Sequence, residues 1–440
     1  MQRILLLMTT TTYKARAFLE AARRLAVPVV VGSDRPQVLS AANPGGSLTL
    51  DFLAPEEATC AIVEFAKRYP IRAVVAADDD GAILAAMAAA ALGLPHNPVD
   101  AVAAARNKHR MREVLAAAGV PSPRFACFSI DEDPDEVAGR VSFPCVIKPL
   151  FLSASRGVIR ADTPAQFGAG FQWVAGILRQ PEVAAQGGTL ARQILVETFI
   201  PGVEVALEGL LVKGELRVLA LFDKPDPLEG PFFEETIYVT PSRLPTSVQQ
   251  SIVGCTAEAV RALGLEHGPV HAELRVNDEG AWILEIAPRS IGGLCSRTLR
   301  FGAGISLEEL ILRQTMGLGV ASLERERRAA GVMMIPIPQA GILREVRGQE
   351  EAHRVPGIEE IRLTIPVGHE VVPPPEGGRY LGFIFARGET AEGVEAALRE
   401  AHGRLTFLIT PPAEKPEQGE GAAGANLRVD RRQRLRLGLQ

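Results

Sequence analysis

Residues 268–293 read GPVHAELRVNDEGAWILEIAPRSIGG, and this stretch decides the fold. Apolar and polar side chains alternate along residues 270–276, which is the period of a β-strand with one buried face. The same alternation returns along residues 281–287, after a short polar segment that ends in glycine. Two alternating runs with so short a connection predict an antiparallel β-hairpin.

The turn of this hairpin determines which side chains face each other. If Asn277 pairs with Ala281, the loop contains three residues, and Gly280 is free to adopt a positive φ. That register sets Glu273 directly opposite Glu285, with Cβ atoms about 5 Å apart and two charges that repel. A hard divalent cation such as Mg²⁺ would offset the repulsion. The alternative is a register shifted by one residue, with both carboxylates in water.

Composition indicates an ordinary globular protein. The chain has 440 residues, of which 47% are hydrophobic and 22% charged, so it is long enough for about two to four domains. The net charge of −5 provides no general attraction to nucleic acid or to anionic membranes. We therefore expect neither nucleic acid nor a membrane as a partner.

Cysteine usage and the apolar segments bear on the compartment. The five cysteines are scattered and form no CxxC motif, which argues against a disulfide framework or a zinc site. The apolar run at residues 4–8 is too short for a convincing signal peptide. The longest apolar block, residues 81–94, is too short to span a bilayer. We predict a cytoplasmic protein.

The first hundred residues predict a Rossmann-like parallel unit, because strand patterns alternate with helix patterns. The predicted strands are residues 3–8, 27–32 and 71–76, and the predicted helices are residues 13–25 and 82–92. No GxGxxG follows the first strand, where MTTTTYKA stands instead, and no Walker motif occurs in the chain. This unit is therefore not expected to bind a dinucleotide in the usual way.

Three acidic residues, Asp78, Asp79 and Asp80, follow the strand at residues 71–76. Acids at the end of a strand can bind a metal ion, but more often they cap the helix that follows. We expect them to cap the helix at residues 82–92.

Two lysines lie where an anion would stabilise them. Lys108 is in the first turn of a predicted helix at residues 107–118, where a cation is unfavourable by about 0.3–1 kcal/mol. A bound phosphate would offset this, although a solvated basic face is an equal alternative. Lys148 lies in a buried strand at residues 143–150, FPCVIKPL, and a buried lysine needs an anionic partner.

Two further segments have the features of a nucleotide site. Ser153, Ser155 and Gly157 form a small loop between strands, which can close over phosphates with its backbone N–H groups. Many ordinary hairpins look similar. Glu197 ends a buried strand that leads into a hinge able to offer backbone groups to a purine, and Glu204 beyond it can accept hydrogen bonds from ribose hydroxyls. The alternative is an edge strand with ordinary exposed glutamates.

Downstream, residues 211–222 predict a hairpin around Lys213 and Gly214, and residues 223–245 predict a long proline-rich loop that is functional or disordered. Helices are predicted at residues 247–263 and 307–316. After these, short strands and one helix predict a smaller α+β domain. The strands are residues 332–338, 341–347, 358–366, 380–386 and 405–409, and the helix is residues 390–402.

Taken in order, these motifs resemble the ATP-grasp superfamily over roughly residues 1–320. The motifs are Lys108, Lys148, the loop at residues 153–157, Glu197 in VETFIPGVE, and Glu273 and Glu285 followed by Arg289. The resemblance is greatest to carboxylate–amine ligases, especially the L-amino acid ligases that make dipeptides. Residues 332–409 are similar to the small C-terminal domain of that group, notably in GILREVRG and YLGFIFARG.

The resemblance implies a multidomain chain of α/β and α+β parts with an ATP-grasp fold. The implied parts are a Rossmann-like N-terminal unit (1–105), a linker helix (106–125), an ATP-grasp lid subdomain (126–200), an antiparallel-sheet core subdomain (201–320), a C-terminal α+β domain (321–410) and a disordered tail (411–440). The tail is rich in Pro, Glu and Gly and ends in a short basic segment.

The resemblance also implies roles for the matched residues. ATP would contact Lys108, Lys148, Ser153, Ser155, Gly157, Glu197, Phe199, Ile200 and Glu204. Glu273 and Glu285 would be ligands of Mg²⁺ or Mn²⁺. Arg289 and Lys148 would be the catalytic residues that stabilise the transferring phosphoryl group. His271, Lys224, Glu235 and Arg289 fall where such ligases contact their substrates.

One residue departs from the family pattern. The family often has an asparagine two residues after the second glutamate as a further metal ligand, and this chain has Ala287 there. The number of metal ions is therefore left open.

The implied reaction joins a small carboxylic acid to an amine through an acyl-phosphate, with release of ADP and Pi. The alternatives are a carboxylase, another phosphoryl-transfer enzyme or a degenerate ATP-binding protein. A homodimer is one option for the assembly.

Overall fold

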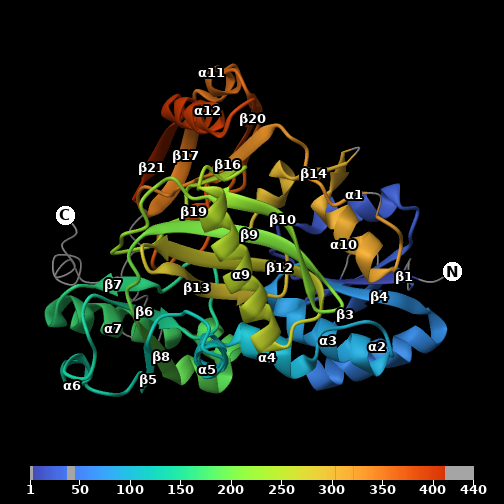
Figure 1. Ribbon diagram of the computed structural model, residues 1–440, viewed down its shortest axis with the longest axis horizontal. Coiled ribbons are helices and arrows are strands. Elements are labelled where there is room, and N and C mark those ends of the chain that lie inside the picture. The colour runs from blue at the N-terminus through green and yellow to red at the C-terminus, as the bar shows by residue number, and fades with distance from the viewer. Residues whose placement is uncertain (1–2, 37–44, 303, 321, 412–440) are drawn as a thin grey trace, which may run out of the picture.

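The structure is a computed structural model that describes residues 3–36, 45–302, 304–320 and 322–411. Figure 1 shows a large central sheet with the N-terminal elements at the lower right, a green and cyan group of elements at the lower left, and the C-terminal elements at the top. Among the described residues, no helix combines the length and the apolar character that crossing a bilayer requires.

The N-terminal unit is a sheet with the strand order β3-β2-β1-β4. Its strands are β1 (Arg3–Leu7), β2 (Val29–Ser33), β3 (Ser47–Thr49) and β4 (Ile71–Ala76). Its helices are α1 (Ala15–Arg24), α2 (Pro55–Arg68), the 3-10 turn η1 (Asp79–Gly81), α3 (Ala82–Ala91) and α4 (Val99–Arg106). All of these strand pairs are parallel, which confirms the Rossmann-like prediction. The carboxyl ends of β1 and β4 lie side by side and lead into polar residues.

Helix α5 (Lys108–Ala117) connects this unit to the next group of elements, which we call the lid. The Asn107 side chain caps this helix, because it accepts hydrogen bonds from the backbone N–H groups of His109 and Arg110. The lid sheet is antiparallel, with the order β5-β8-β6-β7. The lid consists of β5 (Phe125–Ser129), α6 (Pro134–Ala138), β6 (Cys145–Pro149), β7 (Ile159–Ala161), α7 (Pro164–Leu178), α8 (Pro181–Gly187), η2 (Gly188–Arg192) and β8 (Gln193–Thr198).

The central sheet has eight strands in the order β13-β12-β9-β10-β11-β16-β20-β18, and every pair is antiparallel. The strands are β9 (Val203–Val212), β10 (Glu215–Asp223), β11 (Ile237–Thr240), β12 (His267–Asn277), β13 (Gly280–Ala287), β16 (Ala329–Ile335), β18 (Ile358–Leu363) and β20 (Gly382–Gly388). Between them lie α9 (Thr246–Leu263), η3 (Cys295–Thr298), β14 (Arg300–Phe301), β15 (Ile305–Ser306) and α10 (Leu307–Thr315). The sheet thus crosses the boundary that the sequence places between residues 320 and 321.

The remaining C-terminal elements pack on the far end of this sheet (Figure 1). Helix α12 (Ala391–Gly403) covers β16 and β20, with Val394 and Leu398 in the core. A separate antiparallel sheet has the order β19-β17-β21. Its strands are β17 (Gly341–Arg347), β19 (Glu370–Val371) and β21 (Thr406–Thr410), and the short helix α11 (Gln349–His353) lies after β17. The tail predicted to be disordered, residues 411–440, lies outside the described residues except for Pro411.

In the β12–β13 hairpin the two glutamates pair as predicted, but the turn and the register near it differ from the prediction. Glu273 does pair with Glu285, but Asn277 pairs with Gly280, so the turn is one residue shorter than predicted. A β-bulge with Leu284 as the extra residue shifts the register by one and restores the pairing. The predicted turn was therefore wrong, and the predicted glutamate pair is correct because the two deviations cancel.

A second correction concerns residues 223–245, which were predicted as a loop. Residues 237–240, IYVT, form strand β11 between β10 and β16, and all four are buried. A strand that is buried on both faces has no polar residue at every second position, so it lacks the alternation used to detect strands. The strand is also only four residues long, too short for its apolar run to be recognised as a strand.

The turn between β8 and β9 requires glycine. Gly202 has φ +117°, and a Cβ at this position would lie 2.1 Å from the carbonyl oxygen of Val276. We predict that Gly202→Ala lowers the midpoint of thermal unfolding by several degrees, because the positive φ alone costs about 1–3 kcal/mol and the backbone clash adds to it. Gly214→Ala is the matched control, since Gly214 has φ +79° and no atom lies within 4 Å of the point that a Cβ would occupy there. Equal losses in the two variants would contradict the clash.

Candidate active site

A cleft of about 320 Å³ lies between the N-terminal unit, the lid and the central sheet. The sequence-predicted site residues that line it are Lys108, Lys148, Ser153, Ser155, Glu197, Phe199, Ile200, Glu204, Glu235, His271, Glu273, Glu285 and Arg289. Two predicted residues do not line it. Gly157 is buried behind its loop, and Lys224 is buried beneath the acidic side chains of the cleft.

Glu197 ends strand β8 as a buried carboxylate between two cations. Arg112 Nε lies 2.7 Å from Glu197 Oε1, and Lys148 Nζ lies 2.6 Å from Glu197 Oε2. Burial opposes ionisation of this carboxyl group, but the two cations outweigh burial and lower its pKa below the ordinary value. Lys148 therefore has the anionic partner that its buried strand required, and both oxygens of Glu197 are engaged.

Helix α5 reaches the hairpin as well as the lid. Lys108 Nζ donates a hydrogen bond to the carbonyl oxygen of Leu152 at 2.8 Å and lies 3.4 Å from Glu285 Oε2. One turn later, Arg112 Nη2 donates to the carbonyl oxygen of Leu284 at 2.6 Å. The same helix therefore links the loop after β6 to the residues that hold the paired glutamates.

The other member of the glutamate pair has its own cations. Glu273 Oε1 lies 3.3 Å from Lys224 Nζ and 3.4 Å from His271 Nε2. Burial opposes ionisation of Glu273, but Lys224 and His271 hold its pKa well below the usual value. The other ring nitrogen of His271 lies 2.6 Å from Glu208 Oε1. Burial lowers the pKa of His271, yet its hydrogen bonds to Glu208 and Glu273 raise the pKa to about 9.

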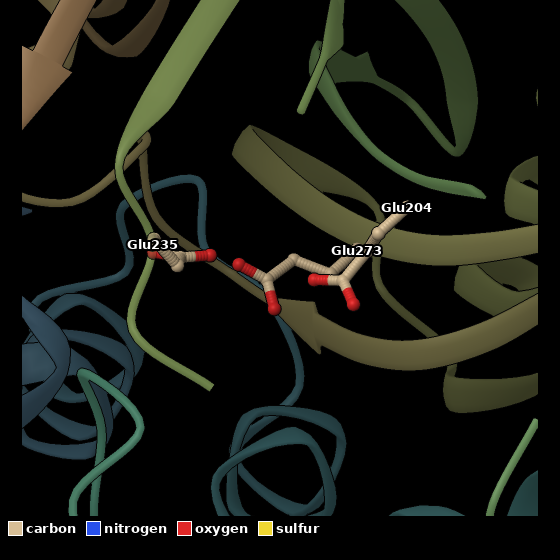
Figure 2. Close-up of side chains that lie close together, drawn as sticks. All are labelled: Glu204, Glu235 and Glu273. Atoms are coloured by element: carbon tan, nitrogen blue, oxygen red, sulfur yellow. The ribbon is translucent and has the colours of Figure 1, made fainter. Parts of the chain in front are cut away.

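Two further acidic side chains, Glu204 and Glu235, lie close to Glu273. Glu204, Glu235 and Glu273 each present a carboxylate oxygen within 4.8 Å of the others, and Figure 2 shows Glu235 and Glu273 pointing toward each other. Lys224 lies beneath them, with Nζ 2.9 Å from Glu204 Oε1 and hydrogen bonded to Glu235. Burial opposes protonation of Lys224, but these carboxylates raise its pKa well above the ordinary value. Burial also raises the pKa of Glu235 to about 7.

These oxygen donors fit a hard divalent cation. Glu273 and Glu285 face each other across neighbouring strands and both line the cleft, and carboxylate oxygens are the ligands that Mg²⁺ and Mn²⁺ prefer. Ala287 offers no ligand and is buried. Glu204 and Glu235, which both approach Glu273, are additional oxygen donors in this part of the cleft. The carboxylates gathered closely enough to share a metal ion are Glu204, Glu235 and Glu273, and Glu285, the predicted second ligand, faces Glu273 across the hairpin.

Arg289 is held by an acid from the N-terminal unit. Arg289 Nε lies 3.1 Å from Asp79 Oδ2, and Arg106 Nη1 lies 3.1 Å from Asp79 Oδ1. Burial raises the pKa of Asp79, but the two arginines outweigh burial and hold it well below its usual value. The prediction that Asp78, Asp79 and Asp80 cap the next helix was wrong, because no side chain caps η1 or α3. The reason is that two arginines compete for the buried carboxylate of Asp79.

Sequence reasoning missed several contacts that support the cleft. Arg112 lies one turn from Lys108 and therefore on the same side of helix α5. Glu208 and Arg275 follow Glu204 and Glu273 at a spacing that strands place on one face. Arg275 Nε lies 3.2 Å from Glu204 Oε2, and its Nη1 donates to the carbonyl oxygen of Ile200 at 3.0 Å. The spacing of Arg112, Glu208 and Arg275 could have identified them from the sequence. No feature of the sequence indicates that Asp79 pairs with Arg289.

Three family models match the chain in an order that agrees with this architecture. An ATP-grasp N-terminal domain matches residues 19–96, an ATP-grasp domain matches residues 141–298, and L-amino acid ligase C-terminal domain 2 matches residues 333–410. The ATP-grasp domain match contains Lys148, Glu197, both glutamates of the hairpin and Arg289.

Individual proteins give the same result. The chain is 27% identical to alanine–anticapsin ligase of Bacillus amyloliquefaciens over 58% of its length, and it spans only 56% of that ligase. It is 28% identical to dapdiamide A synthase of Enterobacter agglomerans, with 68% of the chain and 71% of the synthase covered. Its structure superimposes on the L-amino acid ligase from Bacillus licheniformis with a TM-score of 0.78 at 25% identity, covering 93% of this chain and 99% of that one. The chain therefore contains ATP-grasp domains and the C-terminal domain of L-amino acid ligases, and it is similar in sequence and structure to amino acid ligases.

Proposed function

We propose that this protein uses ATP to join a small carboxylic acid, most naturally an amino acid, to an amine. The observation that carries the proposal is the convergence of Lys148, Arg289 and the Glu273–Glu285 pair on one cleft. Lys148 comes from the lid, the two glutamates come from the two strands of the hairpin, and Arg289 follows the second strand. Together they supply the charges that phosphoryl transfer to a carboxylate requires.

In the first step, a carboxylate oxygen of the acid attacks the γ-phosphorus of ATP. The bond between that phosphorus and the bridging oxygen of ADP breaks, and an acyl-phosphate and ADP result. Lys108 and Lys148 lie where they can neutralise the phosphates, and Arg289 faces the developing charge. Mg²⁺ held by Glu273 and Glu285 supplies additional charge neutralisation when it is bound.

In the second step, the nitrogen of the amine attacks the acyl carbon. A C–N bond forms, the bond from that carbon to the phosphate oxygen breaks, and inorganic phosphate and one proton leave. The acyl-phosphate must be kept from water, which would hydrolyse it. We assign this protection to the loop at residues 153–157, whose Ser153 and Ser155 line the cleft.

We assign the adenine and ribose contacts to the hinge between the lid and the central sheet, residues 199–204. The ring of Phe199 is fixed between two guanidinium groups, 4.0 Å from Arg160 and 4.7 Å from Arg275. Because Glu197 is occupied by two cations, we assign the adenine contacts to the backbone of Phe199 and Ile200. Glu204 is also paired with two cations, Lys224 and Arg275, but unlike Glu197 it is only half-buried, and we propose it as the contact for the ribose.

Substrate contacts are proposed on the wall that holds His271 and Glu235. Both line the cleft, and a carboxylate such as Glu235 is suited to bind the ammonium group of an amino acid. Lys224 would act from behind, because it is hydrogen bonded to Glu204 and Glu235 rather than exposed to the cleft. We propose a cytoplasmic setting, supported by the five cysteines, all of which are free thiols.

Release of ADP in the presence of pairs of amino acids tests this function. We expect ADP and Pi to form at equal rates only when an acid and an amine are both present, with Mg²⁺ in the buffer. Glu285→Gln should reduce the rate about 10²–10³-fold, because it weakens the site for the Mg²⁺ ion that neutralises the phosphates. Glu279→Gln is the matched control, since Glu279 is an exposed residue in the turn of the same hairpin. Bicarbonate-dependent turnover without an amine would refute the ligase assignment.

The Asp79–Arg289 contact predicts a second result. Asp79→Asn should lower kcat about 10- to 100-fold, because Arg289 loses the charged partner that fixes its position. Asp80→Asn makes the same chemical change one residue away, at a side chain that also borders the cleft but accepts a 3.2 Å hydrogen bond from Gln186 and has no ion pair with Arg289, and it should have a much smaller effect. Steady-state kinetics on both variants checks this, and similar losses in the two would exclude a specific role for Asp79.

A further inference from the structure

The lid has few apolar contacts with the rest of the molecule. Its hydrophobic core is built from its own residues, with Phe167, Phe171 and Trp173 of α7 packed against β6 and β8. Among the described residues, Phe232 is the one apolar side chain from outside the lid that packs against this core. The position of the lid over the cleft is therefore set largely by polar contacts.

Several of these polar contacts come from one C-terminal segment, residues 373–378, which precedes β20. The backbone N–H of Gly157 donates to the carbonyl oxygen of Pro375 at 2.8 Å. Arg156 Nε donates to the carbonyl oxygen of Glu376 at 2.8 Å. The loop at residues 153–157 is thus hydrogen bonded at two successive residues to a segment more than two hundred residues away.

The same segment also binds the helix behind the loop. Trp173 Nε1 donates to Glu376 Oε1 at 2.7 Å, and the Trp173 ring packs edge-on against Phe232 at 5.5 Å. Arg156 Nη2 donates to Gln180 Oε1 at 2.7 Å, at the start of α8. Arg156 and Glu376 therefore tie together the loop, two lid helices and the C-terminal part.

The loop itself needs such support. Ala154 and Ser155 have φ +54°, in the left-handed region that side chains disfavour, and each such residue costs about 1–3 kcal/mol unless its surroundings hold it in place. Neither residue is a glycine, so the conformation is not intrinsic to the sequence. The hydrogen bonds of the next two residues, Arg156 and Gly157, hold the loop immediately after this strained pair.

We propose that Arg156 and Glu376 are positioning residues through which the C-terminal segment 373–378 holds the loop 153–157 over the cleft. This inference rests on the proposed function in one respect, namely the role of that loop in keeping water from the acyl-phosphate. Its consequence is that the C-terminal part couples ATP consumption to amide formation, although Arg156 and Glu376 do not line the cleft themselves.

The first test measures coupling. The variants Arg156→Met and Glu376→Ala should raise the ratio of ADP released to amide formed from near one to about two or more, because the loosened loop admits water. KM for ATP should rise about five- to tenfold, the effect expected from loss of one ordinary hydrogen bond. Arg192→Met is the matched control, since Arg192 is exposed and its ion pair with Asp131 lies within the lid.

The second test needs no nucleotide. Hydrogen–deuterium exchange at residues 153–157 should be about fivefold faster in both variants than in the wild type. Arg156→Met removes the donor to the Glu376 carbonyl and Glu376→Ala removes the acceptor of Trp173, and each change loosens the segment that binds the Gly157 amide. If Glu376→Ala does not fold, Trp173→Phe removes the indole donor while keeping an aromatic ring against Phe232. It should show the same acceleration to a smaller degree.

The outcomes separate the two proposals. Faster exchange with no ADP release in the wild type would refute the ligase function and leave the positioning role intact. Unchanged exchange and an unchanged ratio, equal to those of Arg192→Met, would refute the positioning role. Faster exchange with an unchanged ratio would refute the coupling by the C-terminal segment.

Discussion

The cleft is organised around the mutual repulsion of two carboxylates, Glu273 and Glu285, that β12 and β13 hold directly opposite each other. Repulsion at this separation must be offset by positive charge. Each glutamate has its own cation in the structure, Lys224 for Glu273 and Lys108 for Glu285. Lys108 begins the linker helix α5, and Lys224 follows strand β10 of the central sheet. The ion pair of Lys108 with Glu285 therefore also holds the linker helix against the central sheet.

Charge compensation also defines how the parts of the molecule meet. Arg112 joins a buried carboxylate of the lid to a backbone carbonyl of the hairpin, and Asp79 joins the N-terminal unit to Arg289. A buried ion pair is costly to break because the remaining charge is left unpaired. These contacts therefore hold reactive side chains in fixed orientations, which is the main contribution a protein makes to phosphoryl transfer.

Apolar packing divides the molecule differently. One hydrophobic cluster runs from Phe18 of the N-terminal unit to Phe222 and Phe383, which lie on strands β10 and β20 of the central sheet. The lid has a cluster of its own. The N-terminal unit and the central sheet thus share a core while the lid has its own, so polar contacts supply much of what holds the lid against the rest of the molecule.

The sequence alone determined the parallel N-terminal unit and the glutamate pair, because alternation is a local property, and the order of its charged motifs gave the resemblance from which most of the predicted site residues were correctly placed in the cleft. It did not reveal strand β11, whose four buried residues carry no alternation, or the bulge at Leu284 that corrects the hairpin register. Only the tertiary structure decided that Asp79 binds Arg289 and that Glu376 reaches the lid, because the chain brings such distant residues together only when it is folded.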